Sequence, residues 1–171
     1  IEFVTLSAGT YQMEFEKNNL KQAVKEAISM VRLDAENKGI EIVFNDDKNL
    51  PNCLFDHDSI LDLTLSLLTN AIKFTKKGLI EVDCFVKDEN ICLSIKDSGI
   101  GIREKDTKRI FEPFQLIPLD DDMKQSGGTG LGLPIAKSIA KQHGGNLEVN
   151  SIYGEGTEFI VTLPLGNHPE K

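Results

Sequence analysis

The 171-residue sequence has no tryptophan, only two tyrosines and three cysteines, and no long apolar run. The cysteines, Cys53, Cys84 and Cys92, form neither a CxxC pair nor a zinc spacing. We therefore expect buried, reduced thiols rather than a disulfide framework or a metal centre. The longest apolar stretch, residues 60–68, is interrupted by Asp62, which excludes the roughly 18 apolar residues that a membrane span needs.

Basic residues are also in the minority. The chain has 19 Lys and Arg against 27 Asp and Glu, a formal net charge of −8 at pH 7. This excludes nucleic acid as a general partner, because phosphate binding needs a basic face. Hydrophobic residues make up 40% of the chain, which predicts a globular core, and the length suits one compact domain.

Hydrophobic periodicity predicts alternating helices and strands. The helical spacing recurs over 18–39, 56–75 and 131–145. Alternating residues predict strands, the last four paired as two hairpins, over 11–17, 40–45, 79–86, 90–97, 146–153 and 157–165. We expect Asp56 or Asp58 to cap the second helix. This order predicts an α+β fold, a two-layer sandwich in which helices cover one face of a mixed sheet.

Asp97 ends a strand in which every second residue is apolar. Alternation places Asp97 on the same face as Ile91, Leu93 and Ile95, so its carboxylate is expected to point inward. A buried carboxylate needs a hydrogen-bond donor, because leaving it unpaired is costly. Two interpretations stay open: a tight turn closed by the Gly99 amide, or a hydrogen bond from the exocyclic amine of a ligand such as adenine.

Polar and aromatic residues also gather near the end of the predicted helix 56–75. Asn70, Lys73 and Phe74 stand at i, i+3 and i+4 and so share one patch. An amide oxygen, an ammonium group and a ring suit a magnesium ion, a phosphate and a planar base. The alternative is an ordinary solvated helix face.

Residues 98–130 form an unusually long, glycine-rich connection. Its last glycines precede a helix, where backbone amides and the positive helix end can approach a phosphate. The spacing is neither GxGxxG nor a P-loop, and a simple hinge is the alternative. The motif FEPF, with Phe111 and Phe114, is expected to anchor this segment.

Four motifs together resemble a known family. LLTNAIKFTKKG, DSGIGI, FEPF and GGTGLGLPIAK stand in this order and resemble the N, G1, F and G2 boxes of the catalytic ATP-binding domain of sensor histidine kinases. The closing GEGTEFIVTLPL resembles that family's last hairpin. The resemblance implies the Bergerat ATP-binding fold over 13–166. Residues 1–12 would end a linker from the dimerisation helices, and 167–171 would form a tail.

The resemblance also implies ATP and Mg²⁺ as cofactors, with site residues at matching positions. Asn70 would coordinate the magnesium and Lys73 would contact the phosphates, and these are the two catalytic positions. Asp97 would accept the adenine amino group. The remaining nucleotide-binding positions are Phe74, Gly99, Gly101, Ile102, Phe114, Gly128, Thr129, Gly130, Leu131, Gly132, Leu133 and Thr157. Thr157 would support the contact between acid and adenine, often through water.

Two positions depart from the family: His57 stands where the family often has proline, and Ser66 is the second. Ser66 stands four residues before Asn70, where many histidine kinases have Asn or His and the ATP-hydrolysing relatives have Glu. A serine hydroxyl cannot activate water as that glutamate does, so gyrase-type ATPase activity is not expected.

The resemblance implies phosphoryl transfer to a histidine on a separate helical domain. His57, His143 and His168 do not stand in such a context, so the chain is expected to be the ATP-binding half of a kinase, unable to autophosphorylate alone. Its implied partners are nucleotide, the dimerisation domain with the phosphoacceptor histidine, and a downstream response regulator receiver domain. A cytoplasmic location is implied, with neither nucleic acid nor direct membrane contact. The alternatives are a non-transferring module that binds ATP or ADP, and a serine kinase of the same fold.

Overall fold

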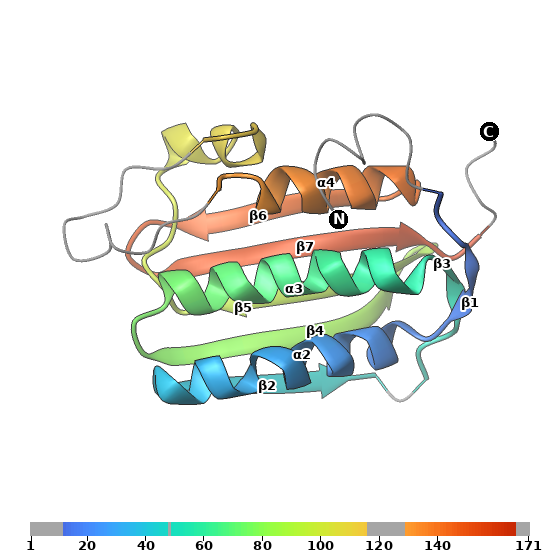
Figure 1. Cartoon of the computed structure of the whole chain (residues 1–171), viewed down its shortest axis with the longest axis horizontal. Coiled ribbons are helices and arrows are strands. Elements are labelled where there is room, and N and C mark those ends of the chain that lie inside the picture. Colours follow the sequence, from blue (N-terminus) through green and yellow to red (C-terminus); the bar gives the residue numbers. More distant parts are fainter. Residues whose placement is uncertain (1–11, 48, 116–128, 167–171) are drawn as a thin grey trace.

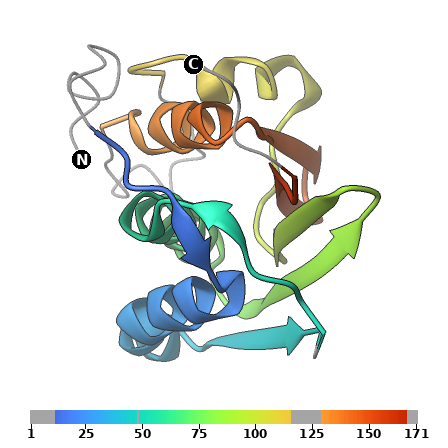
Figure 2. The same ribbon diagram turned by 90° about the vertical axis from the view of Figure 1, so that its right-hand side faces the viewer.

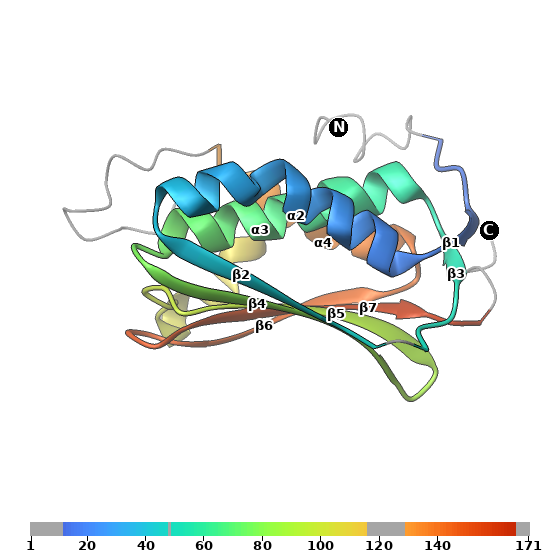
Figure 3. The same ribbon diagram turned by 90° about the horizontal axis from the view of Figure 1, so that it is seen from below.

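Three helices lie over one face of a five-stranded sheet, and no helix of the described residues covers the opposite face (Figures 1 and 3). The computed structural model describes residues 12–47, 49–115 and 129–166. The predicted linker 1–12 and tail 167–171 fall almost entirely outside these ranges, so those boundaries stay predictions. Within the described ranges, no helix has the length and apolarity needed to cross a membrane.

The sheet is mixed, as the sequence predicts. Its strands run in the spatial order β2 (Ile40–Asp46), β4 (Gly78–Lys87), β5 (Asn90–Asp97), β7 (Gly156–Pro164) and β6 (Asn146–Ile152). β2 pairs parallel to β4, and the other pairs are antiparallel. The covering helices are α2 (Leu20–Asn37), α3 (His57–Phe74) and α4 (Gly132–Gln142). The predicted α+β two-layer sandwich is therefore confirmed.

The long glycine-rich connection holds two short 3₁₀ turns, η1 (Glu104–Asp106) and η2 (Arg109–Phe111). Residues 116–128 of this connection lie outside the described part of the chain.

The strand predicted for 11–17 is wrong in extent. The pairing covers only β1 (Glu16–Asn18), which lies antiparallel to β3 (Cys53–Phe55) in a separate two-stranded ribbon (Figure 2). β3 was not predicted, because three residues are too few for an alternating pattern. Ahead of the ribbon, the Glu14 N–H donates to the Asp56 carboxylate at 2.7 Å.

Asp56 begins α3, as one of the two predicted caps. Its carboxylate accepts a hydrogen bond from the Ser59 N–H at 2.8 Å, which satisfies one of the free donors of the first turn. Burial would raise the pKa of Asp56, but hydrogen bonds from Ser59 and Glu14 lower it overall. The Asp56 N–H donates to Nε2 of the buried His143, whose Nδ1 lies 2.8 Å from the Ile139 carbonyl oxygen.

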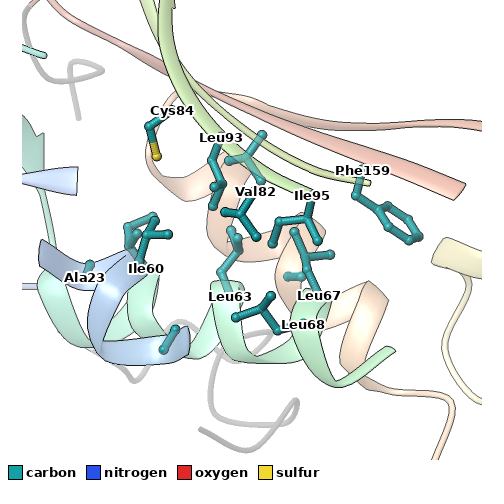
Figure 4. Packing of buried hydrophobic residues seen from close by; sticks show 14 of the residues in the cluster. Ala23, Ile60, Leu63, Leu67, Leu68, Val82, Cys84, Leu93, Ile95 and Phe159 are labelled. Carbon is teal, nitrogen blue, oxygen red and sulfur yellow. The ribbon is translucent and has the colours of Figure 1, made fainter. Parts of the chain in front are cut away.

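The core lies between the helices and the covered face of the sheet. Leu63 and Leu67 of α3 point toward Val82 of β4 and toward Leu93 and Ile95 of β5, and Leu68 belongs to the same cluster (Figure 4). All of these side chains are buried, so the alternation in β5 aims its apolar residues at the helices, as predicted. The same alternation aims Asp97, the last residue of β5, at the helix layer.

Candidate functional site

The predicted site residues gather at one end of the sandwich. There α3 and β5 end, and α4 and β7 begin, at the left of the view in Figure 1. Residues far apart in the sequence therefore meet at this end. Close contacts join the end of α3 to the loop after β5, and the start of α4 to α3.

Asp97 is buried, with 5% of its surface exposed. Its Oδ1 accepts a hydrogen bond from the Gly99 N–H at 2.8 Å, so the turn interpretation is confirmed. Burial raises the pKa of Asp97 to about 6, although backbone hydrogen bonds from Gly99 and Thr157 act in the opposite direction. An ionised carboxylate offers about four acceptor positions, so these two amides leave Asp97 able to accept from a ligand as well.

Asp97 belongs to a row of polar residues on the covered face. Asp97 pairs with Thr157 of β7, and Thr157 pairs with Ser151 of β6. We call these three residues the polar row. Elsewhere on this face, the equivalent positions are apolar, as in the row Leu93, Val161 and Leu147. The polar row therefore interrupts an otherwise apolar surface at the end where the predicted site lies.

Ser151 was not predicted as a site residue, although the sequence pattern marks it. Leu147 and Val149 alternate toward the helices, so the next inward position is Ser151, a polar residue where an apolar one is expected. The same reasoning identified Asp97.

Close packing explains the two glycines after Asp97. A Cβ on Gly99 would lie 2.4 Å from the Phe74 carbonyl oxygen, and one on Gly101, where φ is +68°, 2.1 Å from the Ile152 oxygen. The Ile100 N–H donates to the Phe74 carbonyl oxygen at 3.2 Å. The loop is thus wedged between the end of α3 and β6.

Asn70, Lys73 and Phe74 are half-buried at the end of α3. Lys73 Nζ lies 5.0 Å from the centroid of the Phe74 ring, and burial lowers the pKa of Lys73. The amide, the ammonium group and the ring therefore form one patch, as predicted, next to the loop that carries Asp97.

The described glycines of the G2 motif bring the start of α4 against neighbouring segments. Gly130 has a φ of +69°, and its carbonyl oxygen accepts from the Phe114 N–H at 3.1 Å. Gly132 begins α4, and a Cβ there would lie 3.9 Å from Ser66 Oγ. The Leu131 N–H donates to Thr129 Oγ1 at 3.3 Å. Leu133 packs against the core. Gly128 lies outside the described residues.

The prediction that the FEPF motif anchors its segment is confirmed for one of its two phenylalanines. The ring of Phe111 packs edge to face against Phe159, with 6.4 Å between the ring centroids. Lys137 Nζ lies 4.1 Å from the centroid of the Phe111 ring. Phe114, in contrast, is 71% exposed. Phe111 therefore anchors the segment, and Phe114 does not.

A second residue that the sequence did not reveal is Lys38, just after α2. Its Nζ lies 2.6 Å from the carbonyl oxygen of Ile72 and 3.3 Å from that of Lys73. A cation at these carbonyls is favourable, because the last carbonyls of a helix lack partners within the helix. Lys38 therefore holds the end of α3 from one side, while Ile100 holds it from the other. Contacts across such a sequence separation leave no local pattern to detect.

A shallow hollow of about 580 Å³ lies against the sheet away from these residues, and its lining includes Asn45, Asp83, Ser94 and Glu158. Asn45 donates to Asp83 at 2.9 Å, and Ser94 donates to Glu158 at 2.8 Å. None of the predicted site residues lines this hollow, so it is separate from the candidate site.

Comparison with known proteins places this geometry in a family. Residues 55–167 match the family described as histidine kinase-, DNA gyrase B- and HSP90-like ATPase. The chain belongs to this family. Its two-layer arrangement is the Bergerat fold, and it is an ATP-binding catalytic domain of the type found in histidine kinases.

Two curated relatives have 34% identity to this ATP-binding domain. The non-motile and phage-resistance protein of Caulobacter vibrioides aligns with 100% of the chain. The autoinducer 2 sensor kinase/phosphatase LuxQ of Vibrio cholerae aligns with 96%. The chain spans only 21% and 20% of the lengths of these proteins.

Solved structures agree with this assignment. Full-length ShkA in complex with AMPPNP has a TM-score of 0.84 and 26% identity, covering 98% of this chain and 35% of that chain. The catalytic domain of histidine kinase ThkA has a TM-score of 0.78 and 28% identity, covering 90% of this chain and 97% of that chain.

The raised pKa of Asp97 predicts a pH-dependent stability. Between pH 4 and 6 the folded domain binds this proton and the unfolded chain does not, so the contribution of Asp97 to stability falls as pH rises. The variant Asp97→Asn avoids burying a charge. From pH 4 to pH 7 it should gain about 2 kcal/mol relative to the native domain. Urea denaturation at both pH values measures this gain. Asp34→Asn, at an exposed position in α2, is the control, and an equal gain there would contradict the prediction.

The contact of Lys38 with the end of α3 predicts a second effect. Lys38→Met keeps the aliphatic stem but removes the ammonium group from the two carbonyls, so it should lower the free energy of unfolding by about 1 kcal/mol. Amide hydrogen exchange should rise in the last turn of α3. Lys108→Met, at an exposed position between the 3₁₀ turns, should change stability by less than about 0.5 kcal/mol. Equal losses in the two variants would show that the contact does not matter.

Proposed function

We propose that this domain binds Mg-ATP at the end of the sandwich and donates the γ-phosphoryl group to a histidine on a separate dimerisation domain. The observation that carries the proposal is Asp97, a buried carboxylate with acceptor capacity to spare, next to the patch at the end of α3. An exocyclic amine of adenine is a donor that would use this capacity. The complex of the similar ShkA with AMPPNP supports a nucleotide as the ligand.

The residues around Asp97 suit the rest of the nucleotide. Phe74 offers a ring for the base, and Lys73 offers a positive charge for the phosphates. Asn70 would hold Mg²⁺ through its amide oxygen, and the ion would neutralise charge on the phosphates. The backbone at Thr129, Gly130 and Leu131 leads into the positive end of α4, which favours an anion.

Under this proposal, the domain acts by positioning and charge neutralisation. The nucleophile is the imidazole of the partner domain, so this chain has to supply neither a nucleophile nor a base. Ser66 lies beside the start of α4, where a carboxylate could otherwise activate water. A hydroxyl is too weak a base for that step, so the bound γ-phosphoryl group would be kept for the acceptor.

The proposal includes the wider setting of the domain. Residues 13–166 form the ATP-binding unit, and the phosphoacceptor domain and a response regulator receiver domain are its partners. We place it in the cytoplasm, where ATP is abundant and where buried free thiols such as Cys53, Cys84 and Cys92 remain reduced.

Nucleotide binding can be tested by calorimetry. Native protein should bind ATP in the presence of Mg²⁺, and Asp97→Asn should weaken binding by about 1–3 kcal/mol, because the acceptor for the base is altered. Asn70→Ala should remove the dependence of affinity on Mg²⁺. Unchanged ATP affinity in Asp97→Asn would show that the base lies elsewhere.

Phosphoryl transfer needs a second assay. Incubating the domain and γ-labelled ATP with the separately produced dimerisation domain should label the latter, and the label should be acid-labile, as expected for phosphohistidine. An acid-stable label would indicate a serine kinase. ATP binding without any transfer would indicate a module that only senses nucleotide.

A further inference from the structure

Ser151 uses its full hydrogen-bonding capacity within the site. Its Oγ lies 2.8 Å from the Ile102 backbone nitrogen, 2.8 Å from the Gly156 carbonyl oxygen and 2.9 Å from Thr157 Oγ1. A serine hydroxyl has one proton to donate and two lone pairs that accept. The three partners therefore use all of the hydrogen-bonding capacity of the Ser151 hydroxyl.

The chemistry of these partners fixes the direction of each hydrogen bond. The Ile102 N–H can only donate, and the Gly156 carbonyl oxygen can only accept. Ser151 must therefore give its single proton to Gly156, because two oxygen atoms at 2.8 Å with no proton between them would repel. The remaining contact is possible only if Thr157 donates its own proton to Ser151.

This assignment determines what Thr157 presents to a ligand. The hydroxyl proton of Thr157 is donated to Ser151. Only the two lone pairs of the Thr157 oxygen remain for a ligand, and lone pairs can only accept. Thr157 is buried, with 6% of its surface exposed, and pairs directly with Asp97 on the same face of the sheet. The two side chains together form a pair of acceptors, and a ligand or bridging water must supply N–H or O–H donors to satisfy them.

We propose that Ser151 is a positioning residue that makes the site selective for a purine with a 6-amino group, by holding the Thr157 hydroxyl as an acceptor. The proposal rests on the proposed binding of ATP at Asp97. Without Ser151 the Thr157 hydroxyl would rotate freely and could turn its proton toward the base. The site would then lose part of its preference for a donor at position 6.

The test compares two nucleotides that differ only at position 6. ATP carries the amino group, and purine riboside triphosphate has a hydrogen there. Calorimetry at pH 8 gives the ratio of their dissociation constants for each variant. Ser151→Ala should reduce the preference of the native protein for ATP by roughly three- to tenfold, the effect of one hydrogen bond. Ser151→Thr, which keeps a hydroxyl, should retain the preference of the native protein for ATP.

The control variants separate selectivity from folding. Ser94→Ala removes a hydroxyl of another sheet serine, bonded to Glu158 at 2.8 Å, and should leave the ratio unchanged. Thr157→Val should lower the ratio on its own, and adding Ser151→Ala to it should lower the ratio no further. Should Ser151→Ala fail to fold, Thr157→Val and Ser151→Thr still test the proposal.

The outcomes are distinct. An unchanged ratio in Ser151→Ala, or an equal loss of affinity for both nucleotides, would mean that Ser151 only supports the loop through Ile102, and the inference would be wrong while ATP binding stands. A native protein that binds neither nucleotide would overturn the proposed function itself, and the inference with it.

Discussion

The burial of Asp97 at the end of an apolar sheet face is the constraint on which the site depends. A carboxylate in such a place must be surrounded by donors, and two backbone amides supply part of that need. Each of them comes from a segment that has to approach closely. Gly99 approaches because it lacks a side chain, and Thr157 approaches because β7 pairs with β5. The local geometry of the G1 motif therefore follows from the chemistry of one side chain.

The same constraint extends to the end of α3. The loop after Asp97 is tied to α3 by the Ile100 N–H at the Phe74 carbonyl oxygen, and Lys38 occupies the two preceding carbonyls. The last carbonyls of a helix need hydrogen-bond partners from outside the helix. Here Ile100 and Lys38 are those partners, and their contacts hold the end of α3 next to the loop that carries Asp97.

Much of this arrangement could be predicted from the sequence, because it follows from short-range patterns. Alternation in 90–97 identified Asp97 as inward-facing, and helical spacing placed Asn70, Lys73 and Phe74 on one patch. The ribbon of β1 and β3 escaped prediction because its pairing joins two segments of three residues. Lys38 escaped because only the packing of α2 against α3 brings it to Ile72. Phe114 was misjudged, since an aromatic residue next to proline can equally well point outward.

Helix α3 also joins two distant regions of the domain. Asp56 at its start accepts from the Glu14 N–H of the incoming chain, and Phe74 at its end contacts the loop of the polar row. An 18-residue helix is about 27 Å long and stiff. As one rigid rod, α3 ties the position of Asp56 at its start to the positions of Asn70 and Lys73 near its end. One helix thus spans the distance from the Glu14 contact to the candidate site.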